Sequence, residues 1–339
     1  MAIPVVICDD SAMARKQLAR TLPVAWDVDV SFAKNGIEAV AALKAGKGDV
    51  LFLDLNMPEM DGYEVLQAIH QEDLNTMVVV VSGDIQPEAL QRVKKMGALA
   101  FLKKPVSSEL LIQTLSDFGI CGEQELAVDS KKQTAPSTGV KDATVDYWDC
   151  YREVANVAMG RAADMLARLL GIFVLMPLPN VNMLTRGELR MALNQAGENE
   201  KAAAICQGFI GSGVAGEALL IFHESCLDDI ASLLDYHGEL DERVRIELLM
   251  DIASILIGAC LKGIADQLDI GFSQGQPLVL GHHVRVGDLV DNNPQDWQSI
   301  LAIEMGCRIE NQDINCDLLL LFTEDSLPSL NKYVAYIAD

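Results

Sequence analysis

The sequence predicts two domains: an α/β domain with a doubly wound, parallel five-stranded sheet, followed by an α+β domain with an internal pseudo-two-fold repeat. Three observations support this. In the first 120 or so residues, short apolar runs alternate with helical stretches, and acids, a serine and lysines follow those runs directly. In the remainder, a pattern of about 98 residues occurs twice. A chain of 339 residues also exceeds one typical domain.

The expected parallel sheet is defined by five apolar runs. They lie at 4–8, 28–32, 50–53, 77–81 and 99–102, and the first helical stretches between them lie at 11–22 and 36–45. Continuous apolar strands that alternate with helices are typical of a parallel sheet covered on both faces. In such sheets the functional side chains lie just past the carboxyl ends of the strands. The polar residues that follow these runs are therefore expected to gather at one edge.

A stretch of linker composition separates the two domains, because it has few large apolar residues and no periodicity. We place the first domain at 1–122, the linker at 123–142 and the second domain at 143–339. The second domain divides into repeats of about 144–238 and 239–339. A repeat with two copies is typical of one pseudo-symmetric domain, whereas a solenoid needs three or more.

Each repeat begins with a long predicted helix, at 144–170 and at 241–268, and a proline follows each helix, Pro179 and Pro277. A pair of strands completes each copy. The sequence His282-His283 lies at a predicted turn of the second copy and is expected on the surface.

Charge, cysteine content and hydrophobicity exclude several classes of function. The net charge is −23; residues 1–122 carry 11 Lys and Arg against 16 Asp and Glu, and the remainder carries 15 against 33. So acidic a surface repels polyanions, and no nucleic-acid partner is expected. The eight cysteines lack metal-binding spacing and no export signal is recognised, which predicts reduced thiols and a cytoplasmic location. No uninterrupted apolar run reaches the roughly 18 residues that span a bilayer, so no membrane partner is expected.

The polar residues at the strand ends have the chemistry of phosphoryl transfer. Asp9, Asp10 and Asp54 follow two of the predicted strands, and carboxylates are ligands that Mg²⁺ prefers. A phosphoryl group in transfer also needs a fixed cation and a hydroxyl to hold its oxygens. Lys104 and Ser82 follow the last two strands and supply both groups.

The strings Cys-Asp-Asp-Ser, Leu-Asp-Leu-Asn-Met-Pro-Glu-Met-Asp-Gly, Val-Ser-Gly and Phe-Leu-Lys-Lys-Pro carry a resemblance to the response-regulator receiver family of CheY. The resemblance covers about residues 3–118. It implies that Asp54 is the nucleophile that accepts the phosphoryl group and that Asp9 and Asp10 hold Mg²⁺. It also implies that the backbone carbonyl of Asn56 contributes to the metal site.

The same resemblance assigns roles to three further side chains. Ser82 would contact the phosphoryl group and Lys104, which directly precedes Pro105, would pair with it. Phe101 would be the switch aromatic, where the family often has a tyrosine, so its movement cannot carry a hydrogen bond. The implied phosphodonor is a histidine kinase or another phosphorylated donor.

The helix that opens the second domain carries a polar stripe. Asp149, Glu153 and Asn156 stand at positions i, i+4 and i+7, so they share one face of the helix. Such a stripe alone is more often solvated surface than a site. With the 22 residues that separate Asn156 from Pro179, however, it resembles the signature of the CheC/CheX/FliY family, phosphatases of phosphorylated CheY. This resemblance spans about residues 144–339 and fits the internal repeat.

The phosphatase resemblance implies a mechanism without a strong base. Asn156 would orient a water molecule for in-line attack on an aspartyl phosphate, since an amide both donates and accepts hydrogen bonds. Glu153 would bind the lysine of the receiver, with Asp149 expected at the rim. In the second copy Asp251 and Ser254 take the equivalent positions, and we interpret them as a degenerate site kept for fold symmetry.

The function expected from these patterns is removal of phosphate from phosphorylated receivers, either a free CheY-type receiver in trans or the chain's own receiver in cis. A first alternative is a non-enzymatic adaptor, in which the CheC-like half only binds receivers or flagellar switch proteins. A second is a phosphate sink, in which Asp54 drains a kinase. The sequence leaves open the oligomeric state and whether phosphorylation activates or inhibits.

Overall fold

The structure is a computed structural model of the 339-residue chain. It describes residues 2–120, 146–185, 187–189, 191, 202–223, 226–233, 236, 238, 240–284, 299–310 and 314–338. The predicted linker, 123–142, lies outside these residues. The described chain forms two compact units, Met1–Glu153 and Val154–Ile337. The first unit therefore includes 147–153, about two turns at the start of the helix α6 (Tyr147–Leu170).

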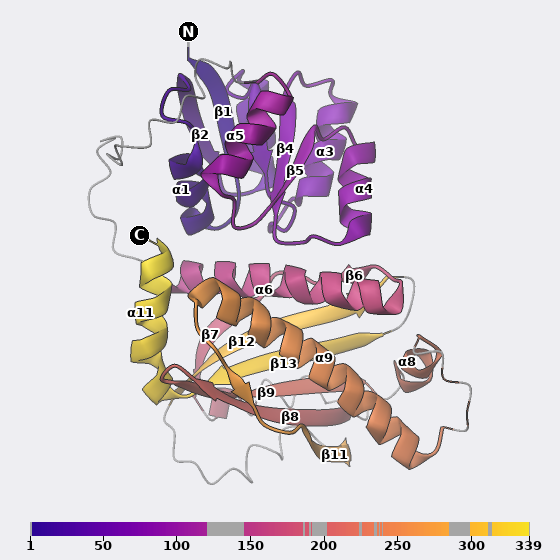
Figure 1. Ribbon diagram of the computed structural model, residues 1–339. Coiled ribbons are helices and arrows are strands. Elements are labelled where there is room, and N and C mark those ends of the chain that lie inside the picture. The colour runs from indigo at the N-terminus through magenta and orange to yellow at the C-terminus, as the bar shows by residue number, and fades with distance from the viewer. Residues whose placement is uncertain are drawn as a thin grey trace. The chain divides into compact units, whose positions relative to one another are not determined.

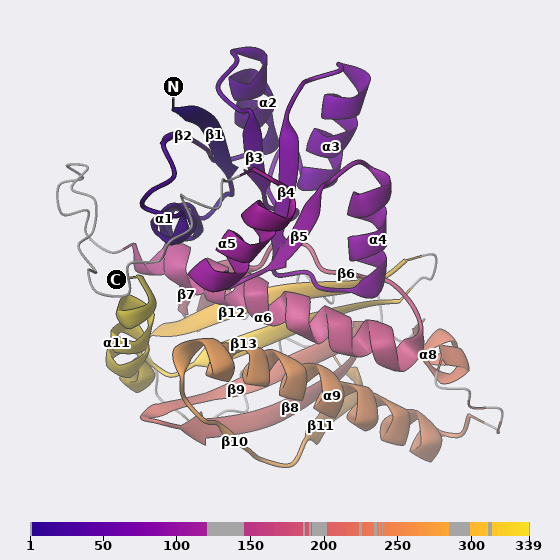
Figure 2. The same cartoon turned by 45° about the horizontal axis from the view of Figure 1, so that its top comes forward.

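The first unit contains the predicted parallel sheet with its helices, drawn from indigo to magenta in Figure 1. Its elements are β1 (Ile3–Cys8), α1 (Ala12–Thr21), β2 (Val28–Ala33), α2 (Gly36–Lys44), β3 (Val50–Leu53), α3 (Gly62–Gln71), β4 (Met77–Ser82), α4 (Pro87–Lys95), β5 (Ala100–Lys103) and α5 (Ser108–Asp117). The strand order is β2-β1-β3-β4-β5, and every pairing is parallel. The prediction of a doubly wound α/β domain is confirmed, and the strand labels can be followed in Figure 2.

Both faces of this sheet are covered by helices. On one face Leu18 of α1 and Leu111 of α5 pack with residues of the sheet, and on the other Val65 of α3 and Val93 of α4 do so. The side chains of β3 are completely buried in consequence, because they alternate between two cores. This burial explains why Val50–Leu53 is a continuous apolar run rather than an alternating one.

The loop after β3 is fixed by close backbone packing at Gly62. A Cβ atom at Gly62 would lie 2.3 Å from the backbone oxygen of Asp54 and 2.8 Å from Cα of Leu55. The Gly62 N–H also donates to the carbonyl of Leu55 at 2.9 Å. Asp61 caps the helix that follows, in a reciprocal capping box with Glu64. The loop that carries Asp54 thus has little freedom to move its backbone.

The second unit contains a sheet whose described strand pairs are antiparallel, together with helices. Its described elements after α6 are β6 (Val174–Leu175), β7 (Asn180–Thr185), β8 (Ala202–Gly211), β9 (Val214–His223), α8 (Leu227–Leu233), α9 (Glu242–Leu268), β10 (Ser273–Gln274), β11 (Leu278–Val284), β12 (Ser299–Ile309), β13 (Asn315–Phe322), a 3₁₀ turn (Glu324–Ser326) and α11 (Leu327–Ala338). The described strands form an eight-stranded sheet in the order β10-β8-β9-β13-β12-β6, with β11 beside β8 and β7 beside β12. Four of these strands, β8, β9, β13 and β12, make up its centre (Figure 1).

Within the second unit, α9 crosses the later part of α6 at very short range. A Cβ atom at Gly263 would lie 2.8 Å from Cα of Ala158. Next to this crossing, the amide of Gln267 donates to the Val154 carbonyl at 2.8 Å. α9 also contacts β8 and β9 (Figure 1). Only glycine permits this approach of the two backbones.

The register of β12 and β13 places two thiols opposite each other. Cys307 pairs with Cys316 in the antiparallel ladder, and both are buried free cysteines. The Ile309 N–H donates to the Ile314 carbonyl at 3.1 Å, at the end of the same hairpin. Because hydrogen-bonded pairs recur at every second residue, the cysteines also occupy a hydrogen-bonded pair.

One detail differs from the sequence predictions. His282 and His283 belong to β11, not to a turn, because the strand continues past two register shifts in its pairing with β8. Among the described helices, α9 is long and apolar enough to cross a membrane by length and composition, although no uninterrupted apolar run of that length was expected. In the most apolar 18-residue stretch of α9, 61% is buried inside the protein. A core helix that is mostly buried can meet the same criterion of length and composition.

Candidate functional site

Three carboxylates converge at the carboxyl edge of the parallel sheet. Asp9 and Asp10 follow β1, Asp54 follows β3, and these strands are neighbours. One oxygen from each of the three carboxylates lies within 4.8 Å of the others. Asp54 is completely buried, and its Oδ1 accepts a hydrogen bond from the Leu55 N–H at 2.8 Å.

A single buried lysine neutralises part of this charge. The Lys104 Nζ lies 2.7 Å from Oδ2 of Asp9 and 3.2 Å from Oδ2 of Asp54. Lys104 follows β5, and its N–H donates to the carbonyl of Ser82 at 3.0 Å, so the two strand ends hold each other in place. A buried charge is tolerated only when it is paired, which this lysine and these carboxylates achieve together.

The pKa values reflect this crowding of charge. Burial raises the pKa of Asp54 well above its usual range, with Lys104 opposing the shift and Asp9 adding to it. Burial and the charge of Asp9 raise the pKa of Asp10 to about 6. Although burial lowers the pKa of Lys104, Asp54 and Asp9 hold it well above its ordinary value, so the ammonium stays charged. The cluster therefore has more negative than positive charge and attracts a cation.

The geometry fits a magnesium ion. Mg²⁺ binds oxygen at about 2.1 Å in an octahedron, so opposite ligands lie about 4.2 Å apart. The ligand atoms of Asp9, Asp10 and Asp54 are spaced within 4.8 Å, close to that requirement. Asn56 lies two residues after Asp54 in the same loop.

Two further predicted receiver residues, Ser82 and Phe101, lie on the neighbouring strands β4 and β5. Ser82 ends β4, is completely buried, and its Oγ accepts from the Asp84 N–H at 3.2 Å. Phe101 lies on β5, partly buried against the core formed with α2, α3 and α4. All the predicted strand-end residues thus gather at one edge of the sheet.

The first two turns of α6 contribute two further carboxylates to the first unit. The Glu153 Oε1 lies 3.1 Å from Nζ of Lys104, and both side chains are buried. Burial raises the pKa of Glu153 to about 7, against the opposing charge of Lys104. Lys104 thus contacts three carboxylates, of which two were predicted from the strand ends and one from the helical stripe.

Asp149 makes a contact that the sequence patterns did not predict. Its Oδ1 and Oδ2 accept hydrogen bonds from the backbone N–H groups of Ala12 at 3.1 Å and Met13 at 2.7 Å. These groups open α1, where N–H groups have no partner inside the helix. Asp149, which we expected at the rim of the site, is partly buried.

Asn156 lies on α6 one turn after Glu153, as the spacing predicts. Its side chain is buried, and its Oδ1 has no hydrogen-bond partner among the residues that the structure describes. Buried polar atoms are normally satisfied by protein or by ordered water. The amide of Asn156 is therefore suited to hold a water molecule.

The second-copy residues have more ordinary surroundings. Asp251 is exposed on α9, and the hydroxyl of Ser254 donates to the Met250 carbonyl of its own helix at 2.8 Å. Glu247, one turn earlier, is exposed and pairs with Arg243 at 3.0 Å. These contacts are those of a solvated helix face.

Sequence reasoning also overlooked Arg15. Its guanidinium donates to the backbone carbonyl of Asp10 at 3.0 Å and also to that of Asp9. These bonds hold the backbone between β1 and α1, on which two carboxylates of the cluster depend. The sequence did contain a signal for these bonds, because this arginine lies one turn into the helix that follows the acidic pair.

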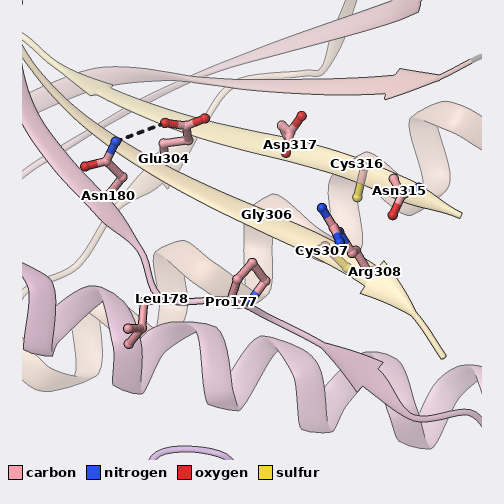
Figure 3. A pocket seen from close by; sticks show the side chains of 10 residues that line it. All are labelled: Pro177, Leu178, Asn180, Glu304, Gly306, Cys307, Arg308, Asn315, Cys316 and Asp317. Carbon is pink, nitrogen blue, oxygen red and sulfur yellow. Dashed lines mark hydrogen bonds between the residues drawn. The ribbon is translucent and has the colours of Figure 1, made fainter. Parts of the chain in front are cut away.

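A polar pocket of about 410 Å³ lies beside β12 and β13 of the second unit (Figure 3). Asn180 and Glu304, which are opposite each other in the pairing of β7 with β12, both line it, and Asn180 donates to Glu304 at 3.4 Å. Arg308 and Asp317 also line it. None of the predicted site residues lines this pocket.

Comparison with known proteins identifies the first unit. Residues 5–116 match the family described as response regulator receiver domain. The chain is 32% identical over 151 residues to protein-glutamate methylesterase/protein-glutamine glutaminase 3 of Rhodospirillum rubrum, covering 41% of each protein. It is 31% identical over 116 residues to the probable transcriptional regulatory protein NarL of Mycobacterium tuberculosis, covering 34% of this chain and 54% of that protein. The chain thus spans about half or less of the length of these relatives, and residues 5–116 form a CheY-like receiver domain.

Two solved structures also resemble parts of the chain. FliY of Thermotoga maritima is 18% identical, with a TM-score of 0.45, over 58% of this chain and 100% of that one. A chain of the CheX–CheY–BeF₃–Mg²⁺ complex from Borrelia burgdorferi is 30% identical, with a TM-score of 0.32, over 34% of this chain and 89% of that one.

Proposed function

We propose that this chain, with its receiver domain at 5–116, is a chemotaxis-type signalling protein that accepts a phosphoryl group on Asp54 and removes such groups from phosphorylated receivers. The observation that carries the proposal is the contact of Glu153 with Lys104 at 3.1 Å. Through it, a side chain of the α6 stripe joins the carboxylate–lysine cluster of a receiver. The resemblance of residues 144–339 to the CheC/CheX/FliY family supports the second half of the proposal.

Phosphorylation would begin with attack of an Asp54 oxygen on the phosphorus of a phosphodonor, such as the phosphohistidine of a histidine kinase. The bond from phosphorus to the donor's imidazole nitrogen would break as the new bond to Asp54 forms, and the imidazole would leave and take up a proton from water. Asp9 and Asp10 would hold Mg²⁺ with the carbonyl of Asn56, and the bound ion would screen the charge of the incoming phosphoryl group. Lys104 and the hydroxyl of Ser82 would hold the phosphoryl oxygens. The aspartyl phosphate that results is a reactive acyl phosphate.

Dephosphorylation requires one aligned water molecule. The water oxygen would attack phosphorus, the bond from phosphorus to the aspartyl oxygen of the receiver would break, and the products would be the aspartate carboxylate and dihydrogen phosphate. Asn156 would accept a hydrogen bond from this water through Oδ1, the atom without a partner among the described residues. In this scheme the water molecule needs to be oriented but not deprotonated before it attacks, so no general base is required.

The order of elements supports one domain built from two similar halves. In the first half α6 precedes β7, β8 and β9, and in the second α9 precedes β11, β12 and β13. We propose that the first half carries the working site. The exposed Asp251 and the internally bonded Ser254 leave the second half with no role in the chemistry.

The first test concerns Asp54 as the phosphorylation site. Beryllofluoride, a mimic of the phosphoryl group, should bind the full chain only with Mg²⁺, and Asp54→Asn should abolish that binding. Fluorine-19 NMR of the protein-bound species measures it directly. Bound beryllofluoride in the Asp54→Asn protein would show that another residue accepts the phosphoryl group.

The second test concerns Asn156, on which the enzymatic proposal depends. Asn156→Ala should slow phosphate release from a phosphorylated receiver on the order of a hundredfold, because a positioning group acts in the transition state. Asp251→Ala with Ser254→Ala is the matched control, and it should retain most of the activity. If folded Asn156→Ala protein releases phosphate at the wild-type rate, the chain is an adaptor that binds receivers without dephosphorylating them.

A further inference from the structure

The loop between β1 and α1 carries two of the three carboxylates of the cluster, Asp9 and Asp10. Both residues follow Cys8, the last residue of β1 that pairs with its neighbouring strands. Arg15, one turn into α1, reaches back over this loop. Its guanidinium Nη1 donates to the Asp10 carbonyl at 3.0 Å and also to the Asp9 carbonyl. One side chain of the receiver therefore bridges two consecutive backbone oxygens beside the cluster.

The two acids of this loop are held in different ways. The carboxylate of Asp9 has a partner on each oxygen, since Oδ1 accepts from the Ser11 N–H at 2.9 Å and Oδ2 lies 2.7 Å from Nζ of Lys104. Asp10 is partly buried, and Arg15 holds it through the backbone. The direction of the Asp10 carboxylate thus depends on the backbone that Arg15 fixes.

The charge of Arg15 and its hydrogen bonds have opposite effects on a cation. A guanidinium beside the cluster repels an arriving Mg²⁺, so Coulomb's law alone predicts that its removal would tighten binding. The hydrogen bonds predict weaker binding after removal, because outer-shell groups that orient metal ligands typically contribute about tenfold to a hundredfold to metal affinity. The sign of the change in affinity therefore separates the two roles.

We propose that Arg15 is a positioning residue of the Mg²⁺ site, which directs the carboxylate of Asp10 at the ion by holding the carbonyls of Asp9 and Asp10. This inference rests on the proposed phosphorylation of Asp54, because that reaction requires the ion. The bonds of Arg15 described above end on backbone oxygens rather than on the carboxylates, so Arg15 is not a catalytic residue.

The test compares the Mg²⁺ affinity of full-length variants in an NMR titration of amide chemical shifts, which also covers weak binding. Arg15→Met keeps the aliphatic stem but loses the donors and the charge, and its affinity should fall about tenfold. Arg15→Lys should recover part of the loss, because an ammonium also donates to carbonyl groups. The matched control is Lys16→Met, which removes the same charge from the exposed neighbouring position of α1 and should leave the affinity unchanged.

A double-mutant cycle tests whether Arg15 acts through Asp10. In the Asp10→Asn protein, adding Arg15→Met should weaken Mg²⁺ binding less than about twofold, since the ligand that Arg15 directs is already lost. Two losses that multiply would show that Arg15 acts on another part of the site.

Two further measurements separate positioning from a general loss of structure. Without Mg²⁺, hydrogen exchange of the Ser11 N–H should accelerate in Arg15→Met and stay unchanged in Lys16→Met. Phosphorylation of Arg15→Met by acetyl phosphate should need about tenfold more Mg²⁺ for half its maximal rate, and should reach the wild-type rate at saturation.

The outcomes distinguish this inference from the proposed function. If folded Arg15→Met protein binds Mg²⁺ as tightly as the wild type or more tightly, Arg15 acts by charge at most, and the inference is wrong while the proposed function stands. If the wild-type chain itself binds neither Mg²⁺ nor beryllofluoride, the proposed function is wrong and the inference fails with it.

Discussion

Among single residues, Lys104 decides the electrostatics of the site. It contacts Asp9, Asp54 and Glu153, so one positive charge faces three carboxylates, with Asp10 nearby. Burial, together with the neighbouring charge of Asp9, raises the pKa of Asp10 to about 6. A cation bound at the site would therefore reduce the electrostatic repulsion among these carboxylates. The affinity of the site for that cation depends on pH.

The pH dependence has a definite sign. Below about pH 6 Asp10 takes up a proton, so the proposed Mg²⁺ site loses one negative ligand as the pH falls. At pH 5 roughly one tenth of Asp10 is ionised, and the apparent Mg²⁺ affinity should be roughly tenfold weaker than at pH 7. Isothermal titration calorimetry at the two pH values measures this. Asp10→Asn should bind weakly at both, and equal wild-type affinities would contradict the assignment.

Among the elements, the strands of the receiver were predictable and the contacts of α6 were not. Val50–Leu53 is buried on both sides, so its apolar run alone predicted the strand. The stripe of α6 could be placed on one face from spacing, because helical geometry is local. The bonds from Ala12 and Met13 to Asp149 join residues 137 and 136 positions apart, and no local pattern encodes such a partner.

The crossing of α6 and α9 makes a prediction about stability. Gly263→Ala should lower the free energy of unfolding by about 1–3 kcal/mol, since its Cβ would meet the backbone of Ala158 at 2.8 Å. Gly258→Ala in the same helix is the control. Its Cβ would meet nothing nearer than Gln274 at 3.8 Å, so replacing a helical glycine there should stabilise by about 0.5–1 kcal/mol. Urea denaturation followed by circular dichroism compares them, and equal midpoints would show that the helices separate easily.

For the whole molecule, the charge is uneven along the chain. The net charge of −23 lies mostly in the part after residue 122. We therefore expect no retardation of DNA by the full chain in a gel, even at low salt, where nonspecific binding is strongest. A basic DNA-binding response regulator serves as the positive control. Retardation that disappears with added salt would reveal a basic surface that the overall charge conceals.

The hairpin of β12 and β13 has a consequence for oxidation. Opposite residues at a hydrogen-bonded position have Cα atoms about 5.5 Å apart, which lies within the range of about 4.4–6.8 Å found for disulfides. Cys307 and Cys316 occupy such a position, so the strand spacing alone does not keep the two thiols apart. The Cys307 thiol and burial raise the pKa of Cys316 well above its usual range. Because the thiolate is the form that reacts, a peroxide that reached this hairpin would find Cys316 in its protonated, unreactive form.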